Sequence, residues 1–451
     1  MALPDAVCRL KDNLKINIPN SVVVALTVLI TAALGLAFAF GLAVQRYKLY
    51  PYPLVAEIEL AIESMLDQRP GAYAWYYSPT EATSRITDNR PNPSDNPLNL
   101  VTSILGDDEL SIQIMDMAGN TVHAWTIDWF DIWPNPQHVA AADIPKAKPG
   151  TLIHGAQLLD NGDVVFNFEN LGMVRMGLCG EVIWKLPYRT HHSIEIDDDG
   201  NLWAPAQRFH TERLADFPKH TPPVSESMVI KVSPDGELLQ EISILELLDR
   251  NELRALLHMP ADKKSNSISG DALHVNDAEP LPASLAQDAS QAGNIMISMR
   301  NISTILIFNP DSYEVSFMYI GGFVRQHDPD YLAGGRISVF DNNNIGPEDF
   351  GQQSRIVILS EEGESAEVFY TGSSEAPFYT SIMGKSQWLT NGNLLITESV
   401  NGRGFEINPD GEIIWEFTNI IAEGRVGIVQ EVQRLPASYT PLFQQASCQL
   451  N

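Results

Sequence analysis

The chain repeats one hairpin pattern six times, and this repeat constrains the fold more than any other feature. In each copy, a turn that contains Gly or Asp precedes a strand rich in apolar and aromatic residues, as in an antiparallel hairpin. The copies read MAGNTVHAW, LCGEVIWKL, SPDGELLQEI, NPDSYEVSF, SEEGESAEVF and NPDGEIIWEF. Their spacing leaves room for one four-stranded unit per copy. The sequence therefore predicts an all-β repeat fold.

A second series of turns precedes each of the last five hairpins, at Gly162, Gly200, Gly293, Gly335 and Gly392. The first hairpin, which begins near Ser111, lacks such an inner partner. The C-terminal segment VQEVQRL resembles the strands that lead into the other inner turns, so we expect it to complete the first unit. This pairing would close the ring and remove exposed sheet edges. We therefore predict a six-bladed β-propeller, with seven or eight blades as the alternative.

The N-terminal region predicts a membrane anchor. Residues 21–44 carry no charge and are long enough to cross a bilayer as a helix. A cleaved signal peptide would have a shorter apolar run and a small-residue cleavage site, so we favour an uncleaved transmembrane helix. Three basic residues precede the run and two follow it, which favours a cytoplasmic tail over residues 1–20.

The segment between the anchor and the propeller, residues 45–100, is predicted to hold a juxtamembrane helix and a linker. Residues 54–69 have the apolar spacing of an amphipathic helix. Residues 70–100 are rich in Pro, Asn, Asp and Ser without periodicity, which is typical of a linker. The propeller is then expected to occupy residues 101–451.

Charge and cysteine content exclude or disfavour several functions. With 57 acidic and 29 basic residues the net charge is −28, which repels nucleic acid, so we expect no nucleic-acid partner. The three cysteines form no CxxC or Cys/His cluster, so neither a metal nor a cofactor is indicated. With the predicted topology only Cys179 and Cys448 share a compartment, and we expect two buried free thiols rather than a disulfide.

Four of the ten histidines occupy one position of the repeat. His154, His192 and His327 each lie eight residues before an inner-turn glycine, and His274 opens the corresponding strand of its unit. The first strand of each propeller blade lines the central channel, so these side chains should converge at one mouth. A packing role between blades is the alternative, but Gly384 stands at the same position in another unit, so packing does not require His there.

Arg300 lies on the strand after His274 and should add a guanidinium to the same mouth, unless it serves as a structural ion-pair partner. Several imidazoles with a guanidinium form a pocket suited to an anion such as sulfate or phosphate. Three neutral imidazoles could also bind zinc, but the absence of Cys and of paired carboxylates disfavours a metal.

Three segments together resemble the bacterial arylsulfotransferase family, over roughly residues 110–436. They read HHSIEIDDDGNLW, then HVNDAE followed by ISMRNISTILIFNP, then GGFVRQHDPDYLAGGRISVFDNN. The resemblance implies a six-bladed propeller without a cofactor. It also implies transfer of a sulfuryl group from an aryl sulfate donor to a phenolic acceptor through a sulfated histidine.

The resemblance also implies roles for individual residues. His327, in QHD, matches the nucleophile, whereas His192, His274 and Arg300 match the groups that bind the sulfuryl oxygens and assist the leaving phenolate. Asn301 and His154 are candidates for substrate binding, although no family role transfers to His154.

Two hypotheses follow. The leading one is a single-pass protein of a bacterial inner membrane, with an arylsulfotransferase propeller in the periplasm. The alternative is a non-catalytic propeller subunit that binds partners in a membrane protein complex. Release of a phenol from a chromogenic aryl sulfate, accelerated by a second phenol, distinguishes the two.

Overall fold

The computed structural model describes residues 20–47, 75–90, 97–141, 143–262, 267–346, 351–360, 363 and 365–445. The chain divides into two compact units, residues 1–75 and 76–451, which are described separately.

The first unit contains the helix α1 (Asn20–Tyr47). Its stretch Asn20–Val44 is long and apolar enough to cross a membrane, and none of the residues in it whose burial is described is buried. At 1.5 Å per residue these 25 residues extend for about 37 Å, more than the roughly 30 Å of a bilayer core. A helix of this kind near an N-terminus serves as a membrane anchor or as a signal sequence. The amphipathic helix predicted at residues 54–69 lies outside the described residues.

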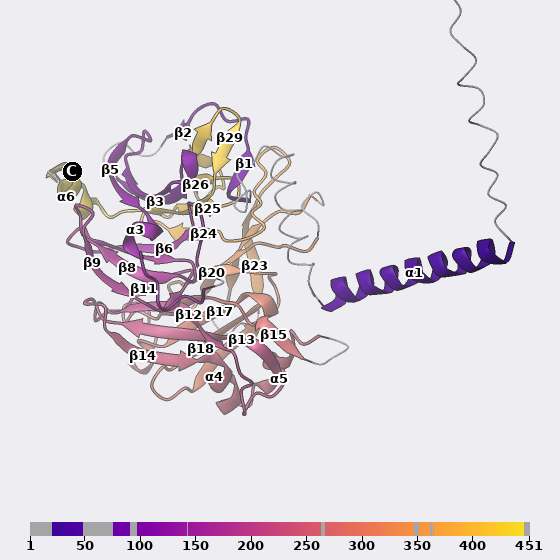
Figure 1. Cartoon of the computed structure of the whole chain (residues 1–451). Coiled ribbons are helices and arrows are strands. Elements are labelled where there is room, and N and C mark those ends of the chain that lie inside the picture. The colour runs from indigo at the N-terminus through magenta and orange to yellow at the C-terminus, as the bar shows by residue number, and fades with distance from the viewer. Residues whose placement is uncertain are drawn as a thin grey trace, which may run out of the picture. The chain divides into compact units, whose positions relative to one another are not determined.

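The second unit is built from antiparallel sheets (Figure 1). Among the described residues, six sheets contain at least four strands each. The first sheet has the order β30-β3-β4-β5, with strands Val429–Arg434, Asn99–Ile104, Leu110–Met115 and Thr121–Ile127. The second has the order β6-β7-β8-β9, with strands Ile153–Leu158, Val164–Phe168, Gly172–Met176 and Val182–Leu186.

The third sheet has a longer hairpin and an extra strand. Its path is β10-β12-β13-β14, and β11 also pairs with β12 while β15 runs parallel to β13. These strands are Arg189–Thr190 (β10), Glu195–Ile196 (β11), Leu202–His210 (β12), His220–Val232 (β13), Leu238–Ser243 (β14) and Ile268–Asp271 (β15). The short helices α4 (Ile244–Arg250) and α5 (Arg254–His258) lie in the insertion between β14 and β15.

The last three sheets follow in chain order. The fourth has strands β16 (Val275–Pro280), β17 (Ile295–Met299), β18 (Thr304–Phe308) and β19 (Val315–Ile320). The fifth has β20 (His327–Tyr331), β21 (Ile337–Asp341), β22 (Arg355–Leu359) and β23 (Ala366–Thr371). The sixth has β24 (Lys385–Trp388), β25 (Leu394–Glu398), β26 (Arg403–Ile407), β27 (Ile413–Thr418) and, beyond β27, β2 (Ile86–Asn89).

All six predicted hairpins form. Each joins the third and fourth strands of one of the six sheets, counted in the strand orders given above. The turn glycines adopt positive φ, as at Gly119 (84°) and Gly236 (84°). The C-terminal segment also pairs as predicted, because β30 joins the first sheet through β3. The prediction of an all-β fold is confirmed.

Two details differ from the sequence prediction. Part of the predicted linker is folded: β1 (Tyr77–Pro79) pairs with β29 (Arg425–Gly427), which also pairs with β28 (Ile420–Ala422), and β2 extends the sixth sheet. The second compact unit accordingly begins at Tyr76 rather than near residue 100. The second difference concerns Cys179, for which the expectation of a free thiol is wrong, because Cys179 is disulfide-bonded. The other two cysteines lie outside the described residues.

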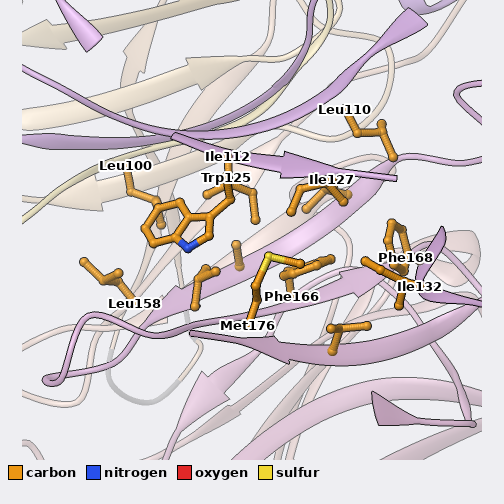
Figure 2. Packing of buried hydrophobic residues seen from close by; sticks show 14 of the residues in the cluster. Leu100, Leu110, Ile112, Trp125, Ile127, Ile132, Leu158, Phe166, Phe168 and Met176 are labelled. Atoms are coloured by element: carbon orange, nitrogen blue, oxygen red, sulfur yellow. The ribbon is translucent and has the colours of Figure 1, made fainter. Parts of the chain in front are cut away.

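The core lies between facing sheets. In the first cluster, side chains of β3–β5 pack against those of β6–β8, and Figure 2 shows the labelled residues of both sheets facing one another. Trp125 on β5 is 2% exposed, and its indole Nε1 donates to the Gly177 carbonyl at 2.9 Å. The indole therefore fills the space between the two sheets and also satisfies its one polar group.

The chain end continues this core. After β30, a 3-10 turn (Ala437–Tyr439) leads into α6 (Thr440–Gln445), which lies beside β5 (Figure 1). Phe443 on α6 is 4% exposed and its ring lies 6.2 Å from that of Trp125 and 5.5 Å from that of His123. The C-terminal helix therefore covers one end of the first core cluster.

Replacing Phe443 with Ala should lower the free energy of unfolding by about 3 kcal/mol, because the change removes a buried ring and leaves a cavity against Trp125. Chemical denaturation of the detergent-solubilised chain, followed by tryptophan fluorescence, measures this loss. The exposed Leu239 on β14 provides the control, and Leu239→Ala should cost less than about 0.5 kcal/mol. Equal losses for the two variants would show that α6 does not contribute to the core.

Candidate active site

Five histidines form one cluster at the starts of the inner strands. His154 lies on β6, His191 and His192 lie between β10 and β11, His274 precedes β16, and His327 opens β20. The ring of His192 is central, with centroids 3.9 Å from His154, 5.0 Å from His274 and 6.0 Å from His327. The structure thus brings together the four histidines singled out by the repeat.

Several residues at these positions, in different sheets, share a left-handed backbone conformation. His192 and His274 adopt φ values of 57° and 55°, and Asp328, which follows His327, has a φ of 47°. Such left-handed conformations are uncommon for residues other than glycine. Gly155 has a φ of 93°, and a Cβ there would lie 1.9 Å from the His192 carbonyl oxygen. No side chain can be accommodated at Gly155, so the close approach of β6 to His192 requires glycine.

The orientation and proton position of His327 are determined by Asn342. His327 Nδ1 lies 2.6 Å from Asn342 Oδ1. The Asn342 amide nitrogen donates to the carbonyls of Thr380 (3.0 Å) and Met383 (2.7 Å), so its oxygen must face His327. Because an amide oxygen only accepts, His327 carries its proton on Nδ1, and Nε2 retains its lone pair. Burial, reinforced by the charge of Arg300, holds the pKa of His327 well below its usual value and keeps the ring neutral.

His274 has a different partner. Its Nδ1 lies 2.6 Å from Asp271 Oδ2, and Gln207 donates to the same carboxylate oxygen at 3.1 Å. Burial alone would raise the pKa of Asp271, but the hydrogen bond from His274 and the charge of that ring outweigh burial, so the pKa is lowered. Asp271 is therefore an ionised partner that can hold a proton on His274.

Arg300 is positioned by the short turn that follows β17. Its backbone N–H donates to the His274 carbonyl at 3.0 Å, which joins this turn to the start of β16. Burial, followed by the charge of Arg325, lowers the pKa of Arg300 to about 10, and the guanidinium remains charged at neutral pH. Asn301 is exposed, and its amide nitrogen donates to the Asp271 carbonyl at 2.9 Å, so this donor supports the loop that carries Asp271.

Several nitrogen atoms of this cluster are buried and have no hydrogen-bond partner within the part of the chain that the structure describes. They are His154 Nδ1, His191 Nε2, His274 Nε2, Arg300 Nε and His327 Nε2. Buried polar groups are nearly always paired, so unpaired ones that converge from different strands indicate a binding site. The Arg300 guanidinium, together with imidazole nitrogens that carry a proton, suits the oxygens of a sulfate or phosphate group.

A layer of charged side chains borders the histidines in the same pocket. No feature of the repeat indicated this layer. Lys385 Nζ lies 3.0 Å from Asp328 Oδ1 and 3.9 Å from Glu195 Oε1. Burial raises the pKa of Asp277 to about 7, although the charge of Lys385 opposes this shift. Gln430 on β30 also lines the pocket and is 3% exposed. One lysine among several carboxylates makes this layer acidic, in contrast to the histidine layer.

Two further residues of the site had no signal in the repeat. His191 is adjacent to His192 but falls outside the eight-residue spacing, and Asn342 is recognisable only as part of the segment FDN. Among the described residues, no group of three or more His, Cys, Asp or Glu side chains is arranged to hold a metal ion.

Comparisons with known proteins give one informative match. The family model of the arylsulfotransferases (ASST) matches residues 155–420, which is more than half of the chain and includes His192, His274, Arg300 and His327. No curated protein matches the chain.

Solved structures show only a weak likeness. A protein of unknown function from Bacteroides caccae is 12% identical with a TM-score of 0.47, over 75% of this chain and 99% of that one. A virginiamycin B lyase from Staphylococcus aureus is 13% identical with a TM-score of 0.33, over 59% of this chain and 69% of that one. A streptogramin B lyase is 10% identical with a TM-score of 0.38, over 74% of this chain and 86% of that one. The assignment therefore depends on the family model, and by that match the chain belongs to the arylsulfotransferase family.

Proposed function

We propose that the protein transfers a sulfuryl group from an aryl sulfate to a phenol through a sulfated His327. The observation that carries this proposal is the contact between His327 and Asn342, because it leaves the Nε2 lone pair free on a buried neutral ring. A neutral imidazole with a fixed lone pair is a suitable nucleophile for a covalent intermediate. Arg300 is close enough for its charge to lower the pKa of His327, so a cation accompanies the nucleophile.

In the first step, His327 Nε2 attacks the sulfur of the donor and the bond from sulfur to the phenolic oxygen breaks. The leaving oxygen takes a proton from Nε2 of His274, which Asp271 holds in the protonated form through Nδ1. Arg300 and His192 donate to the sulfuryl oxygens as charge redistributes in the transition state. The sulfuryl group remains on Nε2 of His327, and a neutral phenol departs.

The second step reverses these roles. An acceptor phenol gives its proton to Nε2 of His274, its oxygen attacks the sulfur, and the bond from sulfur to His327 breaks. His327 regains its lone pair and His274 regains its proton, so the full cycle neither consumes nor releases protons. A ping-pong scheme of this kind needs neither a metal nor a cofactor.

We further propose that the six sheets form a closed six-bladed propeller. In support, the inner strands contact one another in cyclic order, including β16 with β20, β20 with β24, β24 with β30 and β30 with β6. The remaining gap is bridged where Gly155 meets the carbonyl of His192. The pocket behind the histidines is lined from every sheet, by His154, His192, Asp277, His327, Lys385 and Gln430.

The proposed cellular arrangement places α1 as a single-pass anchor in a bacterial inner membrane, with residues 1–20 as a cytoplasmic tail and the chain after the anchor in the periplasm. If so, residues 50–451 should be extracytoplasmic and the protein should stay in the membrane fraction after salt and carbonate washes. Fractionation and protease treatment of spheroplasts test both statements. A soluble mature form would identify α1 as a signal sequence instead, and protection of the propeller from protease would reverse the topology.

The nucleophile is tested by His327→Asn, which should lower phenol release from 4-nitrophenyl sulfate by at least about a thousandfold, because no lone pair replaces Nε2. The acid-labile sulfated protein that forms with radiolabelled donor should also disappear. His258 on α5 is exposed and does not line the pocket of His192 and His327, so His258→Asn provides the matched control and should retain native turnover. Native turnover in His327→Asn would refute the assignment.

Arg300→Lys should slow both sulfuryl transfer steps by about ten- to a hundredfold, because a lysine keeps the charge but loses the planar set of donors. The sulfated intermediate should still form, since His327 is intact. Single-turnover kinetics with each half-reaction measured separately give both rates. Arg250→Lys, at an exposed position on α4, is the control. Loss of the intermediate in Arg300→Lys would mean that Arg300 is required for the covalent chemistry itself, contrary to the proposal.

A further inference from the structure

The backbone of Asp328, the residue after His327, adopts a conformation that needs support from other contacts. Its φ is 47°, whereas the residue before a proline, here Pro329, normally adopts an extended conformation. The pairing of β20 with β21 also shifts register at this point, because His327 and Pro329 lie opposite adjacent residues of β21. Asp328 is therefore the extra residue of a β-bulge. A bulge of this kind re-aims the side chains beside it, and His327 is one of them.

The carboxylate of Asp328 bonds to the neighbouring sheet. It is buried, with the residue 8% exposed. Its Oδ1 accepts from Lys385 Nζ at 3.0 Å, and its Oδ2 accepts from the backbone N–H of Ser386 at 2.6 Å. Both partners lie on β24 in the sixth sheet, whereas Asp328 lies on β20 in the fifth. These two bonds, called the Asp328 bridge below, therefore connect the bulge to a different sheet.

Lys385 is charged and does not depend on Asp328 alone. Burial by itself would lower the pKa of Lys385, but the charges of the surrounding carboxylates, with that of Asp328 the largest, raise it. The donor in the bridge is therefore an ammonium group, and hydrogen bonds between ionised groups are the stronger ones. Glu195 Oε1 also lies 3.9 Å from Lys385 Nζ. Since a second carboxylate accompanies the lysine, Asp328 has a role other than neutralising it.

The segment that receives the bridge, residues 380–386, also holds the ring of His327. Asn342 contacts the ring and donates its amide nitrogen to two backbone carbonyls of this segment. Gly384 in the same segment has a φ of 101°, and a Cβ there would lie 2.4 Å from the ring of Phe340, which lies opposite His327 in the sheet. The segment can pack this closely against the strands around His327 only because position 384 is glycine.

We propose that Asp328 is a positioning residue whose bridge to Lys385 and Ser386 holds the bulge, and with it the ring of His327, against Asn342. The ring is then fixed twice by one segment, through its own nitrogen and through the backbone that carries it. The bridge follows from the geometry, whereas its effect on a nucleophile rests on the proposed sulfuryl transfer.

Asp328→Ala removes both acceptor oxygens and leaves a methyl group at a strained φ. It should lower kcat for phenol release from 4-nitrophenyl sulfate by about a hundredfold, the loss expected when a reacting atom is displaced by about 1 Å. The ratio kcat/KM should fall in the same proportion, because binding of the donor is unchanged and both steps use His327.

Two further variants separate the bridge from backbone strain. Asp328→Asn keeps an acceptor for the N–H of Ser386 and tolerates a left-handed φ, so it should stay within about tenfold of the native kcat. Asp328→Gly adopts the same φ without strain but offers no acceptor, so it should be about as slow as Asp328→Ala. Asp328→Gly also serves in place of Asp328→Ala if the alanine variant does not fold.

Asp163 provides the matched control, because it is also buried and ion-paired but does not line the pocket. It is 6% exposed, and its Oδ2 accepts from Arg175 Nε at 2.9 Å and from Nη2 at 2.6 Å. Asp163→Ala should lower the free energy of unfolding, as Asp328→Ala does, because each variant loses a buried ion pair. It should nevertheless keep kcat within about twofold of the native value, because no contact of His327 changes.

The bridge can be observed without an assay of activity, in the full-length protein in detergent with nitrogen-15 labelled serine and histidine. The Ser386 amide proton, assigned by loss of its signal in Ser386→Ala, should resonate far downfield and exchange slowly, because it donates to a carboxylate over a short distance. It should lose both properties in Asp328→Ala and keep them in Asp328→Asn. The ring resonances of His327, assigned by their loss in His327→Asn, should shift in Asp328→Gly but not in Asp163→Ala.

The possible results separate the two proposals. A Ser386 amide without these properties in the native protein overturns the bridge, and this measurement needs no variant. A native kcat in Asp328→Gly overturns the positioning role, and so does an equal loss of kcat in Asp163→Ala. The predicted spectra in a protein that transfers no sulfuryl group would support the bridge and refute the proposed function.

Discussion

The pairing of β30 with β3 is the interaction on which the arrangement of the second unit depends. It places the last strand in register with a strand more than 300 residues earlier, from Asn99 opposite Arg434 to Ser103 opposite Val429. Arg434 reinforces this junction, because its guanidinium donates to Asn99 at 2.8 Å and to Glu406 on β26 at 2.9 Å. Glu406 is fully buried, so the ion pair has few competing water contacts and removal of either partner would leave a buried charge. The backbone bonds of this pairing thereby hold the C-terminal strand in the first sheet, and the side chain of Arg434 links that sheet to the sixth.

Burial determines which protonation states the histidines of the site adopt. The imidazoles of His154, His191, His192 and His327 have lowered pKa values mainly because they are removed from water. Neutral rings differ in function only through the partner of one nitrogen, and here these partners are an amide oxygen for His327 and a second imidazole for His192. His274 has a different kind of partner, because its Nδ1 lies against the carboxylate of Asp271. In the proposed mechanism, the roles of the rings therefore depend on residues that touch no substrate.

The sequence pattern predicts the repeat better than it predicts the contacts within the site. Turn glycines and apolar strands recur at intervals, so the six hairpins, the pairing of the C-terminal strand and the convergence of four histidines follow from counting. The strand β2 could not be predicted in this way, because its sequence ITDN resembles a linker and forms a strand only by pairing with β27 at a sheet edge. Asn342, His191 and Lys385 are likewise not predictable from spacing, because their importance arises from partners on other loops. The disulfide of Cys179 is a further contact of this kind.

The charges in the site affect whether a sulfate ester or a phosphate ester would bind there more favourably. Around the proposed nucleophile the positive charge comes from Arg300 and from Arg325, which acts on it, since His327 and His192 are neutral and His274 is paired with Asp271. Lys385 adds nothing, because Asp328 and Glu195 lie beside it. An aryl sulfate carries a single negative charge, whereas an aryl phosphate at neutral pH would bring a second negative charge into a buried site of a chain with net charge −28. Under the proposed function, neutral imidazole donors favour a monoanionic ester over a dianionic one, and burial of the histidines then contributes to selectivity as well as to nucleophilicity.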